Sequence, residues 1–136
     1  MKTIIEKYLN INDINFTLPA EDIFEFEAES EGGPWKCRIK ICANSAVSIY
    51  AVFPLIVPSS QRPDSAMYLM WLNKERVFGN FELDLDSGEI KFKTFIDCEN
   101  AIFTDRILDR TLFINMATVQ KYLPEFLGHL NRNKVA

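Results

Sequence analysis

The sequence predicts a two-layer α+β domain built from one sheet and several helices. Three observations favour this class. Short segments alternate apolar and polar residues, as strands with one buried face do. Other segments repeat apolar residues every three or four positions, as amphipathic helices do. Runs rich in Gly, Asn, Asp and Ser separate the segments. The expected order is helix, three strands, helix, two strands, helix.

Length and composition narrow the class of protein. The chain has 136 residues, so we expect a single domain over residues 1–136 that buries its own core. The net charge of -4 argues against nucleic acid as a partner, since binding phosphates requires clustered Lys and Arg. No segment approaches the roughly 20 apolar residues that cross a bilayer. The N-terminus has no apolar core of a signal peptide, so we expect a cytoplasmic protein without membrane contact.

The three cysteines do not form a recognisable framework. They are Cys37, Cys42 and Cys98, an odd number without a secretion signal. Cys37 and Cys42 point to opposite faces of a strand, which is poor geometry for a shared zinc ion. We therefore expect buried or half-buried free thiols, with no metal and no cofactor.

The N-terminal half predicts a helix followed by a three-stranded meander. Residues 1–10 have a helical apolar stripe, and residues 23–29, 35–41 and 47–57 are expected strands. In the first hairpin, one register pairs Phe26 with Cys37 on one face and Glu25 with Arg38 on the other. A three-residue loop over 44–46 would pair Ile39 with Ala51. Pro54 should mark a bulge or the end of ladder pairing.

The C-terminal half predicts helix, hairpin, helix. Residues 66–78 form the expected middle helix, with Asp64 or Ser65 as its N-cap. Strands over 81–85 and 90–96 follow, in a register that pairs Leu85 with Ile90 and Glu82 with Lys93. The last helix spans 104–132, and we expect it to continue through Pro124 with a kink.

An acidic cluster lies between the last two predicted strands. Asp84, Asp86, Ser87, Gly88 and Glu89 resemble part of a calcium loop, but glycine and glutamate fall at the wrong positions of that motif. Asp, Ser and Gly are common turn residues, and glycine readily adopts positive φ. The spacing therefore favours a turn.

Some of these segments resemble a known family. The stretch YLMWLNKERVFGNFELDLDSGEIKFKTFI, with Leu72-Asn73, Gly79 and the acidic-turn hairpin, and the final TVQKYLPEFLGHL are similar to the YbjN-like family, small bacterial proteins described as sensory transduction regulators. That family resembles in fold the chaperones of type III secretion, which are generally dimers that bind unfolded protein segments. The resemblance implies a five-stranded antiparallel sheet in order 1-2-3-5-4, with helices on one face, and a binding or regulatory role.

The sequence gives little indication of catalytic activity. It has one histidine, His129, which we expect to cap carbonyls or face water, and it lacks the motifs of hydrolases, zinc proteases and nucleotide-binding enzymes. We therefore expect no catalytic residues and no enzyme.

Contact with another protein is the better indicated function. In the implied strand order, Tyr50, Val52 and Phe95 cluster on the uncovered sheet face, rimmed by charged residues. The alternatives are that Lys and Arg side chains cover this patch or that a bulge at Pro54 rotates the strand. Tyr68, Met70 and Trp71 of the middle helix give a second surface, because one helix face cannot bury them all, unless they pack in the core.

These observations lead to two hypotheses. The first is a non-catalytic, chaperone-like interaction or regulatory module that forms a homodimer and binds another protein chain through its sheet or helix surface. The second is a small-molecule sensor or enzyme with a pocket between sheet and helices, lined by Trp35, Trp71 and Tyr122.

Overall fold

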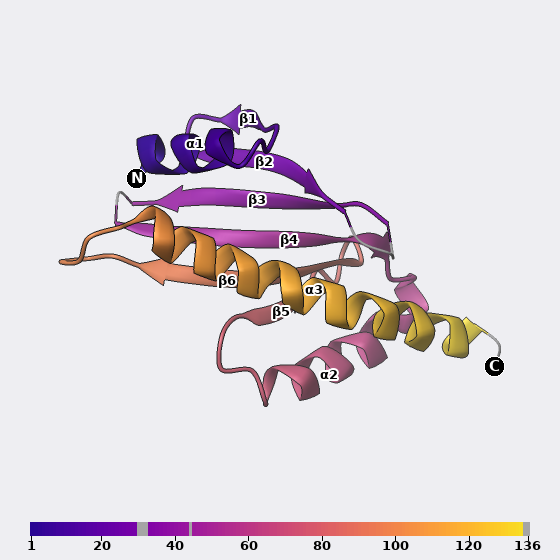
Figure 1. Ribbon diagram of the computed structural model, residues 1–136. Helices are drawn as coiled ribbons and strands as arrows, with labels where there is room; N and C mark the ends of the chain where they lie inside the picture. Colours follow the sequence, from indigo (N-terminus) through magenta and orange to yellow (C-terminus); the bar gives the residue numbers. More distant parts are fainter. Residues whose placement is uncertain (30–32, 44, 135–136) are drawn as a thin grey trace.

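A single sheet carries the fold, with helices packed on one of its faces (Figure 1). The computed structural model describes residues 1–29, 33–43 and 45–134, with side chains as far as residue 130. In chain order the elements are α1 (Lys2–Ile11), β1 (Thr17–Ala20), β2 (Ile23–Ala28), β3 (Trp35–Cys42), β4 (Ala46–Ile56), a 3-10 turn η1 (Ser59–Gln61), α2 (Arg62–Asn73), β5 (Asn80–Leu83), β6 (Glu89–Asp97) and α3 (Asp105–Lys134). In the described part of the chain, no helix is long and apolar enough to cross a bilayer.

The sheet has six strands in the order β1-β2-β3-β4-β6-β5, and each neighbouring pair is antiparallel. The predicted count of five strands in order 1-2-3-5-4 is wrong, because β1 adds a strand at the β2 edge. All four residues of β1 are exposed and one of them is Pro19, so the segment lacks the alternation that indicates a strand. The five predicted strands keep their expected order relative to one another.

The first hairpin has the register that its two faces predict. Phe26 pairs with Cys37, and Glu25 pairs with Arg38. The Arg38 Nε donates to Glu25 Oε2 at 2.7 Å, and Lys36 Nζ lies 3.7 Å from the same carboxylate. The hydrogen bond from Arg38 holds the pKa of Glu25 below its ordinary value. Both faces constrain the pairing, which is why the sequence predicted it correctly.

Two other registers differ from the prediction by two residues. Ile39 pairs with Ile49 rather than Ala51, and Leu83 rather than Leu85 pairs with Ile90. In each case the turn starts earlier than expected. Ala43 has a φ of 50°, which opens the β3–β4 turn. A shift of two keeps each paired side chain on its predicted face, but it leaves Leu85 exposed in a turn instead of on the helix side. Of the two expectations for Pro54, an interruption rather than the end of pairing is confirmed, since the β4–β6 register shifts between Val52 and Ile56 and pairing resumes at Ile56.

The helix boundaries also differ from the prediction. α2 begins at Arg62, with Gln61 as its N-cap and Pro63 in its first turn, so the expected cap at Asp64 or Ser65 is wrong. It ends at Asn73 rather than at residue 78. α3 continues through Pro124 as predicted.

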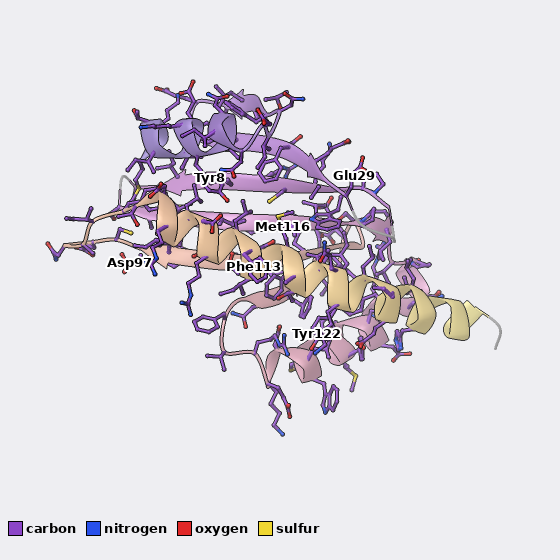
Figure 2. All side chains as sticks on the ribbon, in the orientation of Figure 1. Tyr8, Glu29, Asp97, Phe113, Met116 and Tyr122 are labelled. Atoms are coloured by element: carbon purple, nitrogen blue, oxygen red, sulfur yellow. The ribbon has the colours of Figure 1, made fainter. Side chains whose placement is uncertain are left out.

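The core consists of two clusters that meet along α3. One lies near α1 and contains aliphatic residues such as Ile5, Leu9, Ile39 and Leu108. The other lies near α2, where the Phe81 ring contacts the rings of four aromatic neighbours, Phe53, Phe92, Tyr122 and Phe126. Met116 packs against both clusters, from the middle of α3 (Figure 2).

The boundary between the clusters is polar. Asn115 is fully buried, and its Nδ2 donates to Ile49 O, Phe92 O and Thr94 Oγ1 at 3.1 to 3.3 Å. This one side chain therefore ties α3 to β4 and β6, and no hydrophobic pattern in the sequence indicates it.

Candidate protein-interaction surfaces

The acidic cluster between β5 and β6 is a structural turn. Asp84 Oδ1 accepts the N–H groups of Asp86 and Ser87 at 2.9 and 3.1 Å, and these bonds lower the pKa of Asp84. Gly88 has a φ of 80°, as the turn interpretation expects. Arg62 joins this turn to the residue that follows β4, donating to Val57 O and to Asp86 O at 3.0 Å each. The Asp84 carboxylate therefore stabilises the turn between β5 and β6.

The uncovered sheet face carries the first predicted surface. The registers place Tyr50, Val52 and Phe95 on the same face as Lys91 and Lys93. Val52 is only 9% exposed, and Lys91 and Lys93 lie 5.8 and 5.9 Å from the Tyr50 ring centroid. Phe95 is 57% exposed. The three residues share a face but do not make a continuous apolar patch, because lysine side chains cover its centre. Their role as an interface stays a prediction.

A second surface lies on α2. Met67, Met70 and Trp71 are 69%, 67% and 64% exposed, and their spacing places them on one face of the helix. The opposite face buries Leu69 and Leu72. We call Met67, Met70 and Trp71 the α2 surface. The sequence predicted Met70 and Trp71 here but not Met67.

Tyr68, also predicted on this surface, has a different environment. Its ring is half-buried and packs against α3, stacked 4.8 Å from His129 and edge-on to Phe126 at 5.7 Å. Tyr68 therefore anchors α2 to α3 beside the α2 surface. The expectation that His129 faces water or caps carbonyls missed this ring stack.

α2 also closes the outer edge of β5. The Asn73 side chain accepts the Phe81 N–H at 2.7 Å and donates to Phe81 O at 3.0 Å. These two bonds imitate a neighbouring strand, so the Phe81 backbone is satisfied where the sheet ends. Sequence reasoning noted Asn73 only for its place in the resemblance.

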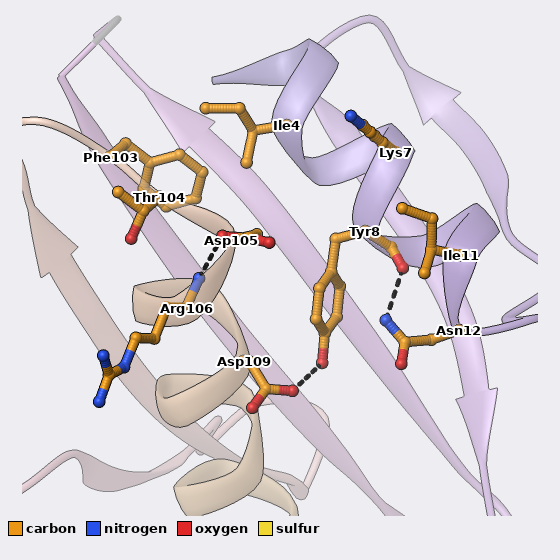
Figure 3. A pocket seen from close by; sticks show the side chains of 10 residues that line it. All are labelled: Ile4, Lys7, Tyr8, Ile11, Asn12, Phe103, Thr104, Asp105, Arg106 and Asp109. Atoms are coloured by element: carbon orange, nitrogen blue, oxygen red, sulfur yellow. Dashed lines mark hydrogen bonds between the residues drawn. The ribbon is translucent and has the colours of Figure 1, made fainter.

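A cleft separates α1 from the start of α3 (Figure 3). It has a volume of about 620 Å³, and Tyr8 points across it to donate a hydrogen bond to Asp109 at 2.6 Å. Burial, followed by this bond, raises the pKa of Tyr8. Lys7 and Arg106 add cationic groups to the lining. No motif in the sequence pointed to this cleft, because α1 and α3 are far apart in the chain.

The pocket predicted from Trp35, Trp71 and Tyr122 is wrong. Trp35 and Tyr122 are buried in the core near α2, whereas Trp71 is exposed on α2, so the three residues do not line a common cavity.

The cysteines are free thiols, as the sequence predicted. Cys37 and Cys98 are buried and Cys42 is half-buried. Burial raises the pKa of Cys37 to about 12. Within the described ranges, no group of three or more His, Cys, Asp or Glu side chains is placed to hold a metal ion.

Comparisons with known proteins agree on the fold. No protein-family model matches the sequence, and no curated protein is significantly similar to it. Among solved structures, the E. coli protein YbjN, described as "a putative transcription regulator", matches with a TM-score of 0.76 at 10% identity, over 95% of this chain and 93% of that one. An uncharacterised protein from Methanothermobacter thermautotrophicus matches with a TM-score of 0.53 at 14% identity, over 91% and 96% of the two chains. The chain has a YbjN-like fold.

Proposed function

We propose that this chain is a non-catalytic protein-interaction or regulatory module, chaperone-like in that it binds another protein chain, and that it forms a homodimer through the α2 surface. The observation that carries the proposal is the exposure of Met67, Met70 and Trp71 side by side on one helix face. Met and Trp are enriched in the buried centres of protein interfaces. Tyr68 and Asn73 fix α2 to the rest of the chain, so the α2 surface stands on a rigid support.

Charge supports contact with protein rather than with nucleic acid. The chain is acidic, with a net charge of -4. Lys91 and Lys93 on the open sheet face lie within ion-pair distance of Glu89 and Glu82, at 3.3 and 2.8 Å. A role in regulation, as the description of YbjN suggests for that protein, would therefore act through protein contacts.

The test is the oligomeric state of Met70→Lys and Trp71→Lys. We expect the wild-type chain to sediment as a dimer and both variants as folded monomers, because a lysine in the centre of an apolar interface buries an unpaired charge. Ile102→Lys is the matched control, since Ile102 is 81% exposed on the β6–α3 connection, away from α2. A monomeric wild type, or variants that remain dimeric, would overturn the homodimer.

A small-molecule sensor is the second candidate, and the cleft between α1 and α3 favours it. Its volume lies in the range of ligand pockets, and it combines the Tyr8 hydroxyl and Asp109 with apolar Ile4 and Phe103. A thermal-shift screen with a metabolite library tests this function. A ligand at 100 times its Kd should add about 2.7 kcal/mol to stability, and Asp109→Asn should remove the effect of a polar ligand bound there.

A further inference from the structure

The end of β6 lacks a strand on the side where β5 lies. β5 pairs with β6 only from Asn80 to Leu83, opposite residues 90–93, whereas β4 pairs with β6 as far as Asp97. Figure 1 shows β6 continuing past the start of β5. Within the described residues, the segment 94–97 is thus paired on one side only. We call this segment the β6 edge.

The backbone groups at the β6 edge can be assigned from neighbouring bonds. Val57 N–H binds Gly88 O, and Cys98 N–H binds Ser45 O, so even-numbered residues point their backbone groups to β4. Asp84 N–H binds Glu89 O, so odd-numbered residues point to the β5 side. Strand geometry alternates with a period of two. The N–H and C=O groups of Phe95 and Asp97 therefore point outward, where the sheet has no further strand.

Gly79 explains why β5 stops short of this segment. Its φ is +79°, and a Cβ placed on it would lie 2.7 Å from Lys93 O and 2.5 Å from the Phe92 ring. The chain coming from α2 thus reaches β6 only at Gly79, and it pairs with β6 from Asn80 onward. The contrast with Phe81 is direct, because there Asn73 satisfies the outward backbone groups.

A groove runs along the β6 edge. Its volume is about 450 Å³, and α3 lines one side while the connection before β5 lines the other. The apolar lining includes Val77, Phe78, Ile107 and Ile114, and Arg110 adds a positive charge. Val77 and Phe78 are both exposed apolar side chains. The groove therefore combines outward backbone groups, apolar walls and a cation.

We propose that the β6 edge binds a short extended segment of a partner protein, which adds to the sheet as a further strand. Only an extended backbone pairs with the outward groups of Phe95 and Asp97. A partner side chain opposite Ile96 faces the helix side of the sheet, where Ile107 and Ile114 line the groove, so apolar residues suit it. An acidic residue on the same face would pair with Arg110. Because α3 and the connection bound the groove on both sides, it admits one chain segment rather than the edge of a second sheet.

Hydrogen exchange of the free protein is the first test. We expect the Phe95 and Asp97 amides to exchange about 100-fold faster than those of Thr94 and Ile96, which are bonded to β4. Equal protection of all four amides in dilute protein would overturn the proposal. Protection of Phe95 that rises with protein concentration would also overturn it, because a second copy would then occupy the edge.

The second test uses a selected peptide as the probe. Short random peptides are displayed and selected on the immobilised wild-type chain, and the most enriched one is synthesised and its affinity measured by fluorescence polarisation. Phe95→Pro removes the outward N–H together with the ring, and it keeps the N–H groups bonded to β4, which belong to Thr94 and Ile96. Proline is tolerated at such edge positions. We expect it to lower peptide affinity about tenfold or more, and the bound peptide to protect the Phe95 and Asp97 amides.

Two control variants make the result specific. Phe95→Ala keeps the N–H and loses the ring, so it should weaken peptide binding less than Phe95→Pro does. An equal loss of affinity in both variants would assign binding to the ring on the open face and would overturn strand addition. Ile102→Lys should bind like the wild type. A failure to enrich any peptide, or equal affinity of Phe95→Pro and wild type, would also overturn the proposal. A monomeric chain that binds the peptide at the β6 edge would overturn only the proposed homodimer.

Discussion

The half of the molecule near α2 and the half near α1 differ in how the backbone groups at the sheet edge are satisfied. Near α2, an aromatic core packs under β5, and Asn73 satisfies the outer backbone groups of Phe81. Near α1, the second core cluster packs under the end of β6, and the outward groups of Phe95 have no strand beside them in the described chain. The comparison teaches that a sheet edge can be closed by a single side chain. Where that side chain is missing, the edge is available to a partner.

The largest effect is expected at the boundary between the halves, from Asn115→Asp. A carboxylate there would face the three oxygens that now accept from Asn115 Nδ2. An uncompensated buried charge costs about 3–5 kcal/mol, so we expect a loss of that size at pH 7 in urea unfolding.

The pH dependence of this variant has a defined sign. Burial and nearby oxygens raise the pKa of an aspartate in the folded state, so the penalty is complete above that pKa and shrinks as pH falls through it. Asn115→Leu is the control, because it introduces no charge and should show no such recovery in acid. An Asp variant as stable as wild type at pH 7 would contradict the assigned contacts.

An intermediate effect is expected from Asn73→Ala, which removes the closing group of the β5 edge. Phe81 loses both side-chain partners, and an unsatisfied backbone group costs about 1–3 kcal/mol. The free energy of unfolding and the exchange rate of the Phe81 amide both measure this. Asn80→Ala is the matched control, because Asn80 is exposed on the same strand. Unchanged exchange at Phe81 would show that Asn73 does not close this edge.

The smallest effect is expected from Tyr8→Phe in the α1 half. The variant loses the hydrogen bond to Asp109, which should cost about 0.5–1.5 kcal/mol near neutral pH. Since the pKa of Tyr8 is raised in the folded state, its contribution is complete below the ordinary tyrosine pKa of 10.0 and is lost at higher pH. The stability difference between wild type and variant should therefore narrow above about pH 10. A difference that is constant with pH would contradict this account.

The sequence predicts which face of the sheet a side chain occupies better than it predicts where strands and turns begin. Alternation correctly placed Phe26 and Cys37 on one face and Glu25 and Arg38 on the other, because a one-residue slip would exchange the two faces. The loop lengths were less determined, since Ala43 at positive φ and the Asp84 side-chain bonds start their turns early. Two registers therefore differ from the prediction while the faces agree.

The candidate sites were predictable only in part. Trp71 was identified because one helix face cannot bury all the apolar residues of α2. The sequence did not predict the β6 edge, because the predicted register paired Phe81 with Thr94 and so extended β5 too far along β6. The structure pairs Phe81 with Phe92. The bonds of Asn73 and Asn115 join segments distant in the chain, and no local pattern of polarity indicates such bonds.

Gly79 determines how much of β6 remains unpaired on the β5 side. Its left-handed backbone decides where β5 begins, and any larger residue there would collide with Lys93 O and the Phe92 ring. If β5 began before residue 79, it would pair with the β6 edge and fill the groove. If β5 began later, more of β6 would be left unpaired. The length of the segment that connects α2 to β5 would then set the extent of the β6 edge, without any change to the core.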